Sequence, residues 1–237
     1  MAKIYADYDG YIVGSSETTN GAAIAVTTGT ATSGSASSAT AVQYYYSSGG
    51  RGGGATHRVT RAFFKFNVSS IRATPTSATL KIYGYGSDDA TVIALSSSAF
   101  TGDGGNALVD DDINNFNKGD VTSIYSTESP SFSTWSTSGY NIISLNQGNA
   151  LSDIQAQDTY TVVLLEHDHD YSETSPGSSD SIAAGMYFVE QAGENRDPYL
   201  EYTSGGYVND PFGIDMDDTA NKVLGVVSED IDEVMGV

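Results

Sequence analysis

The chain has 237 residues and a formal net charge of −20, because 30 acidic residues outnumber 10 Lys and Arg residues. Binding to nucleic acid depends on basic side chains that release counterions from phosphates, so this balance excludes nucleic acid as a partner. The chain has no cysteine, which excludes disulfides and thiolate chemistry. No apolar run approaches the ~20 residues of a membrane-spanning helix, so we expect no membrane insertion.

The composition favours β-structure. Tyrosine is the main aromatic residue, with 16 copies against 8 Phe and a single Trp, and the chain contains 26 Gly. Tyr and Thr pack well on a pleated sheet, whereas a chain rich in Gly, Ser and Thr forms helices poorly. The acidity is typical of a solvated surface that resists aggregation, with calcium binding and life in high salt as alternatives.

The first quarter of the chain combines one strand with a low-complexity segment. Alternation predicts a strand over 5–13. Residues 15–54 are rich in Ser, Thr, Gly and Ala, with candidate strands over 22–28 and 41–46. The run over 49–54 contains five glycines and one Arg, which indicates a loop.

The clearest strand follows at 61–68. Ala62, Phe64, Phe66 and Val68 share one face, and the intervening residues take the other. Further strands are expected over 77–83, 91–95, 140–145, 160–165, 186–190 and 199–202, with a helical turn over 149–155. The polar stretch 103–119, which contains three consecutive aspartates at 110–112, is predicted to be a solvated loop.

Short strands between turn-rich loops predict an all-β fold, an antiparallel β-sandwich of the jelly-roll type, over residues 1–203. Residues 204–237 are predicted to be a linker and a C-terminal tail. Val-Leu-Gly-Val at 223–226 is echoed by Val-Met-Gly-Val at 234–237. We expect this tail either to fold onto its own domain or, as preferred, to dock on another subunit through Val223, Leu224, Val226, Ile231, Val234 and Met235.

Residues 61–83 read Arg-Ala-Phe-Phe-Lys-Phe-Asn-Val-Ser-Ser-Ile-Arg-Ala-Thr-Pro-Thr-Ser-Ala-Thr-Leu-Lys-Ile-Tyr. This stretch resembles the strand–turn–strand signature of DNRLRE-type jelly-roll domains, which are related to carbohydrate-binding modules of secreted proteins. In outline the resemblance extends over roughly residues 1–203, with Trp135 in the middle segment. It implies a surface-exposed binding or spacer role, in some cases with structural Ca²⁺.

The tail, from Asn221 to the terminus, resembles C-terminal tails of tailed-phage structural proteins. The chain begins without an apolar signal sequence, although its composition is typical of extracellular proteins. A virion protein satisfies both observations because lysis releases it from the host cytoplasm. The resemblance therefore implies a location on the virion surface.

The segment Glu166-His167-Asp168-His169-Asp170 is the main candidate for chemistry. On a strand, Glu166, Asp168 and Asp170 share one face and can hold Ca²⁺, while the two histidines on the other can chelate Zn²⁺. Calcium is preferred because the chain is rich in acidic oxygens, and a solvated strand end is the alternative. Trp135 and Tyr140 are candidates for stacking on a sugar ring, with the core or an interface as the alternative.

The sequence contains no Gly-x-Ser-x-Gly, His-Glu-x-x-His or phosphate-loop motif, so we expect no catalysis. The preferred function is a virion structural protein, as a capsid decoration, fibre or tail component, that binds other subunits through its tail and is a homo-oligomer. The first alternative is a carbohydrate-binding or adhesion module that recognises cell-surface glycans. The second is a metal-dependent polysaccharide-active enzyme.

Overall fold

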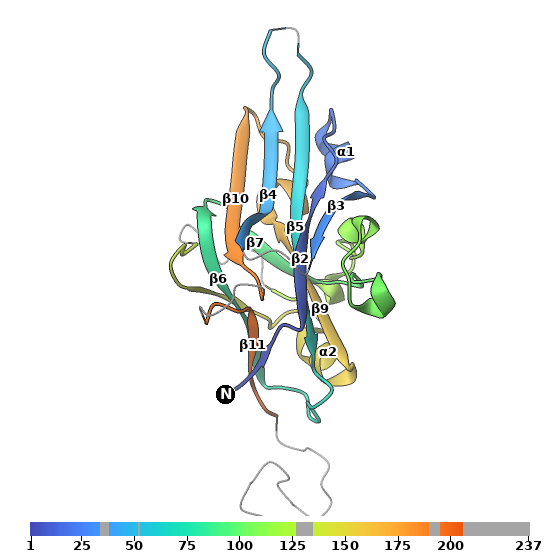
Figure 1. The fold of residues 1–237 in the computed structure, drawn as a ribbon, viewed down its shortest axis with the longest axis vertical. Coiled ribbons are helices and arrows are strands. Elements are labelled where there is room, and N and C mark those ends of the chain that lie inside the picture. Colours follow the sequence, from blue (N-terminus) through green and yellow to red (C-terminus); the bar gives the residue numbers. More distant parts are fainter. Residues whose placement is uncertain (34–37, 52, 127–134, 190–194, 206–237) are drawn as a thin grey trace, which may run out of the picture.

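The structure is a computed structural model that describes residues 1–33, 38–51, 53–126, 135–189 and 195–205. Most of the strands run along the long axis of the molecule (Figure 1). The strands are β1 (Ala2–Tyr5), β2 (Tyr8–Gly14), β3 (Gly29–Ser33), β4 (Ser38–Ser47), β5 (Thr56–Asn67), β6 (Ser77–Asp88), β7 (Val92–Ser96), β8 (Tyr140–Ser144), β9 (Thr159–Glu166), β10 (Asp180–Tyr187) and β11 (Tyr199–Thr203). The helical segments are α1 (Asn20–Ile24), η1 (Asp103–Gly105), η2 (Asp110–Asn114), η3 (Val121–Ser123), α2 (Ala150–Ala156) and η4 (His167–Tyr171).

The strands form two layers that share β6. One layer consists of β1, β11, β6 and β8, and the other of β10, β4, β5, β2 and β3, with β9 paired to β5 and β7 paired to β9. The first half of β6 pairs with β11 and β8, and its second half pairs with β10. Every strand pairing among the described residues is antiparallel. The antiparallel β-sandwich expected from the sequence is confirmed.

Strand β5 separates two hydrophobic clusters. Ala62, Phe64 and Phe66 lie between the layers, in contact with a cluster that includes Leu80 and Ile82 of β6. This is the face that the alternation over 61–68 predicts. Burying a side chain of this size stabilises the fold by roughly 1.5–3 kcal/mol, so the period-two pattern fixes the register of β5 strongly.

The second cluster lies on the other face of the same layer. Phe63 of β5 and Val163 of β9 pack there against Leu108 and Ile113, which belong to the segment between β7 and β8. This segment, together with α1, therefore covers the outside of the sheet. The sheet is buried on both faces, which explains the continuous apolar run at 160–165.

Two local expectations are wrong. The segment 22–28 is not a strand, because Thr19 accepts a hydrogen bond from the Ala22 N–H at 3.2 Å and caps the short helix α1. The aspartates at 110–112 do not form a solvated loop, because Asp112 is fully buried. Its carboxylate accepts hydrogen bonds from the backbone N–H groups of Phe100, Thr101 and Val109 and from the side chains of Thr101 and Asn115, so it organises the covering segment.

The first and last described strands are neighbours. β1 pairs with β11, and Ala2 lies opposite Tyr202. The N-terminus lies at one end of the long axis, and the β4–β5 hairpin extends from the opposite end (Figure 1). No helix in the described part of the chain is long and apolar enough to span a membrane.

Candidate functional site

A buried ion pair lies beneath the segments that cover the sheet. Nε and Nη2 of Arg61, in β5, donate to the two carboxylate oxygens of Asp170 at 2.8 and 2.7 Å, and both side chains are fully buried. The remaining guanidinium N–H groups donate to the carbonyl oxygens of Ile24 and Ile113, both at 2.9 Å, and to Oδ1 of Asn114 at 3.2 Å. Arg61 therefore connects β5, α1, the covering segment and the turn after β9.

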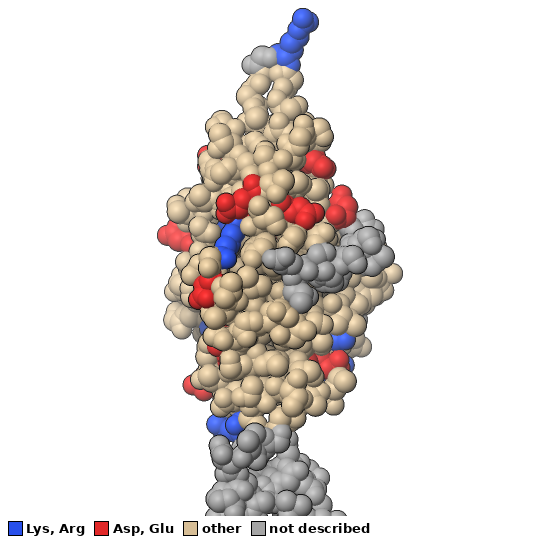
Figure 2. Space-filling view, turned by 180° about the vertical axis from the view of Figure 1, so that it is seen from behind, with Lys and Arg blue, Asp and Glu red and all other residues tan. Residues whose placement is uncertain are grey.

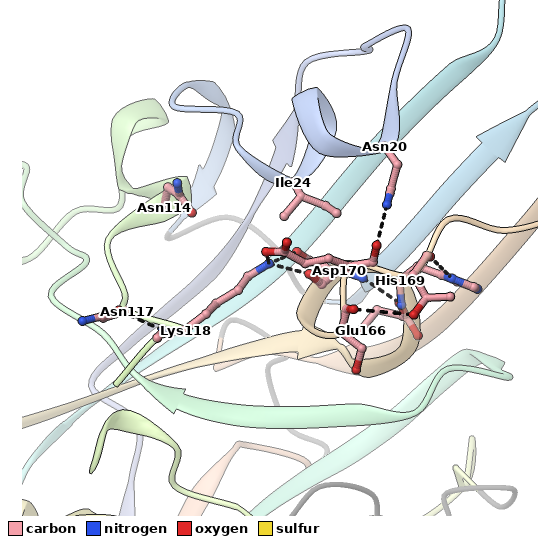
Figure 3. Close-up of polar contacts among 12 residues, drawn as sticks. Asn20, Ile24, Asn114, Asn117, Lys118, Glu166, His169 and Asp170 are labelled. Carbon is pink, nitrogen blue, oxygen red and sulfur yellow. Dashed lines mark hydrogen bonds and ion pairs between the residues drawn. The ribbon is translucent and has the colours of Figure 1, made fainter. Parts of the chain in front are cut away.

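Lys118 approaches the same carboxylate (Figure 3). Its Nζ lies 3.2 Å from Oδ1 of Asp170 and also donates to the Asp170 carbonyl oxygen. Burial on its own raises the pKa of Asp170, but the two cations outweigh that effect and hold this pKa below its usual range. Burial lowers the pKa of Lys118, and Asp170 opposes this shift. The Asp170 carboxylate therefore lies between two cations, Arg61 and Lys118.

Glu166 ends strand β9 and caps the turn that follows it. Its two side-chain oxygens accept hydrogen bonds from the backbone N–H groups of Asp168, His169 and Asp170 at 2.7–3.1 Å. The turn, η4, has π-helical hydrogen bonding, and Glu166 itself is fully buried. Burial raises the pKa of Glu166, and the three backbone N–H groups partly offset this effect.

A second set of hydrogen bonds connects α1 to the sheet. The hydroxyl of Tyr44 donates to the side-chain oxygen of Asn20 and lies 2.7 Å from Nδ1 of His57. Burial, followed by the negative charges of Asp170 and Glu166, raises the pKa of Tyr44 to about 12. Burial lowers the pKa of His57, which favours its neutral form.

The carboxylates predicted to hold Ca²⁺ do not fit such a site. The strand ends at Glu166, so the expected alternation does not continue into Asp168 and Asp170. Glu166 is engaged by backbone N–H groups and Asp170 by cations, while Asp168 is more than half exposed and contacts His167 at 2.8 Å. In the described ranges, no group of three His, Asp or Glu side chains is placed to hold a metal ion. Calcium takes about six to eight oxygen ligands, which this arrangement does not supply.

The residues predicted to stack on a sugar have other environments. Trp135 is 2% exposed in the cluster between the layers, and its Nε1 donates to the carbonyl oxygen of Gly185 at 2.8 Å. Its ring is therefore inaccessible to a glycan, and this expectation is wrong. Tyr140 is half-buried, and its hydroxyl donates to the carbonyl oxygen of Asn195 at 2.8 Å.

Tyr140 belongs to a row of tyrosines that the sequence analysis missed. Neighbouring rings in this row have centroids 5.1–5.6 Å apart. Lys3 lies over the ring of Tyr199 at 4.4 Å, and Arg196 lies over the rings of Tyr83 and Tyr187 at 4.9 and 4.6 Å. These cations cover ring faces that a sugar would use. The row consists of Tyr5, Tyr199, Tyr140, Tyr83, Tyr187 and Tyr85.

A groove of about 580 Å³ opens on the outside of the covering segment. Its lining carries hydroxyl and amide groups, one aromatic ring and no ionisable side chain. Most of the surface in Figure 2 is likewise uncharged, with acidic side chains in a row across its upper part and at several separate places below it. The groove is lined by Ser96, Ser97, Ser98, Asn114, Asn115, Phe116, Asn117, Ser123 and Gln157. The only sequence signal for it was the run Asn-Asn-Phe-Asn at 114–117.

The groove rests on the buried ion pair. The guanidinium carbon of Arg61 lies 4.9 Å from the centroid of the Phe116 ring, and Asn114 accepts a hydrogen bond from Arg61. Asn114 and Asn117 stand on the same loop as Lys118 (Figure 3). The network therefore fixes the loop that forms one wall of the groove.

The six residues predicted to mediate assembly lie outside the described residues, so their docking stays a prediction. They are Val223, Leu224, Val226, Ile231, Val234 and Met235. A comparison with known protein families and with curated proteins finds no match for this chain.

Proposed function

We propose that this protein is a non-enzymatic structural protein of a virion surface. It displays the sandwich outward, as a capsid decoration, fibre or tail component, and docks on neighbouring subunits through residues 204–237. The observation that carries this proposal is the pairing of β1 with β11, which places residues 2 and 202 side by side at one end of the molecule. An attachment there leaves the opposite end, with the β4–β5 hairpin, pointing away (Figure 1).

The interior supports a display role. The Arg61–Asp170 pair joins four chain segments, and Asp112 and Glu166 hold two of these segments through backbone N–H groups. Buried polar groups with all partners in place specify one arrangement of the chain. Such contacts keep the loops of the domain in position.

The test introduces charges into the tail of the full-length chain. Val223→Asp and Val234→Asp place one carboxylate in each copy of the apolar repeat, and Asn221→Asp adds the same charge outside it as a matched control. We expect both repeat variants to fold but to be lost from purified particles, while the control is incorporated. Incorporation of all three variants at equal levels would refute docking through this repeat.

The groove favours a second candidate function, a carbohydrate-binding or adhesion module. Hydroxyl and amide groups around one aromatic ring can hydrogen-bond the hydroxyls of a sugar and contact its apolar face. The supporting observation is the set of Ser, Asn and Gln side chains around Phe116. Calorimetric titration of the full-length protein with a broad glycan panel tests this function, and the absence of any heat of binding would exclude it.

A further inference from the structure

We propose that the groove beside Phe116 binds an uncharged sugar residue and excludes acidic ones. This inference rests on the carbohydrate-binding candidate and names its site and its ligand class. Asn114 and Asn117 donate hydrogen bonds to sugar hydroxyls, and Phe116 contacts the apolar face of the sugar ring.

The lining carries no charge in a chain that has 30 acidic and 10 basic residues. The two cations beside the groove, Lys118 and Arg61, are not placed to bind an anion in it. Lys118 follows Asn117 in the loop, but its Nζ donates to the oxygens of Asp170. The N–H groups of Arg61 are all engaged in hydrogen bonds beneath the groove. A carboxylate of an acidic sugar would therefore lose water without gaining a cation.

The side-chain oxygens of Asn114 and Asn117 are held by hydrogen bonds, which leaves their NH₂ groups as donors. Oδ1 of Asn114 accepts from Arg61 at 3.2 Å, and Oδ1 of Asn117 accepts from the Gly119 N–H at 3.0 Å. Both amides thus direct their NH₂ groups away from these bonds, and both side chains are exposed. Nδ2 of Asn115 donates to Asp112 at 2.7 Å, which leaves its oxygen as the acceptor. Donors and acceptors fixed in this way match hydroxyl groups, which do both.

The aromatic ring is supported from behind. Phe116 is half-buried, and the guanidinium of Arg61 lies 4.9 Å from its ring centroid. Ser97 bridges to Phe116, and the Ser97 hydroxyl donates to the carbonyl oxygen of Asn115 at 2.8 Å. The ring and the amides therefore keep their relative positions before a ligand arrives, which reduces the entropy lost on binding.

The experiment uses the full-length protein and the variants Asn114→Asp and Asn117→Asp. Each aspartate keeps the oxygen that accepts from Arg61 or Gly119, and it replaces the NH₂ donor with a carboxylate oxygen. Asn146→Asp, on an exposed residue outside the groove, is the matched control. The probes are neutral gluco-, manno-, galacto- and chito-oligosaccharides, and oligogalacturonates and oligoalginates of matched length.

We expect the wild-type protein to bind at least one neutral probe and no acidic one. Each groove variant should weaken that binding about tenfold or more, since the NH₂ donor is lost and the new carboxylate must give up bound water when the sugar arrives. The control should bind within about twofold of the wild type. In nuclear magnetic resonance spectra, the side-chain NH₂ signals of Asn114 and Asn117 should shift on addition of the neutral probe.

The other outcomes separate this inference from the function on which it rests. Binding of acidic probes alone overturns the inference and leaves carbohydrate binding standing. Neutral binding that both groove variants retain at full strength overturns the location. Failure of the wild type to bind any probe overturns both, and the incorporation test with tail variants still decides the display function.

Discussion

Replacing Arg61 with Met tests the role assigned to the buried ion pair. The substitution leaves the Asp170 carboxylate fully buried without its bidentate partner, and it removes the donors to the carbonyl oxygens of Ile24 and Ile113. Removing one partner of a buried pair costs about 3–5 kcal/mol, because an uncompensated charge stays behind. Lys118 remains 3.2 Å from Asp170 and limits the loss, so we expect the lower half of that range.

The assay is equilibrium unfolding in urea, followed by the fluorescence of Trp135. This is the chain's single Trp, and it is 2% exposed, so its emission reports the loss of the core. The double variant Arg61→Met/Asp170→Leu removes both charges together, and it should recover much of the stability that the single variant loses. A loss below about 1 kcal/mol for Arg61→Met, or a double variant that shows the sum of two large losses, would refute the reasoning.

The remaining predictions concern three other buried positions. Glu166→Gln places an NH₂ group against the backbone N–H groups that Glu166 caps, so it should cost about 1–3 kcal/mol in the same urea assay; a neutral result contradicts the cap. Burial lowers the pKa of His57 in the folded protein. The neutral His57 therefore contributes its full stabilisation at a pH above the unfolded-state pKa of about 6.5, and this contribution falls as the pH drops below that pKa. His57→Gln should therefore flatten the stability curve between about pH 7 and 5, and parallel curves would rule this out. A Cβ on Gly185 would lie 1.6 Å from the Tyr85 carbonyl oxygen, so Gly185→Ala should destabilise by more than about 4 kcal/mol. The control Gly21→Ala meets nothing within 4 Å and should be neutral or stabilising by up to about 1 kcal/mol, as thermal unfolding would show.

Local patterns predicted the sandwich well. The alternation over 61–68 identified the buried face of β5, and the apolar run over 160–165 identified a strand covered on both sides. These features depend on neighbours along the chain, and period two is a property of any strand. The helical turn over 149–155 was also confirmed, as α2.

The site was harder to predict, because its contacts join distant segments. Arg61 and Asp170 are 109 positions apart, and a single sequence offers no reason to pair them. The acidic segment 166–170 was treated as a continuing strand, whereas the Glu166 carboxylate captures three backbone N–H groups and starts a turn. The same physical effect, a carboxylate that satisfies backbone donors, buried Asp112 where an aspartate run indicated solvent.

The two-sided burial of β5 has a consequence for variation among sequences of this type. Phe63 and Phe64 are adjacent in the chain but face separate interiors. Changes at Leu108 or Ile113 of the covering segment alter the packing of the cluster that contains Phe63, whereas Phe64 belongs to the other cluster. The wall of the groove can therefore vary in sequence while the packing between the layers stays constant.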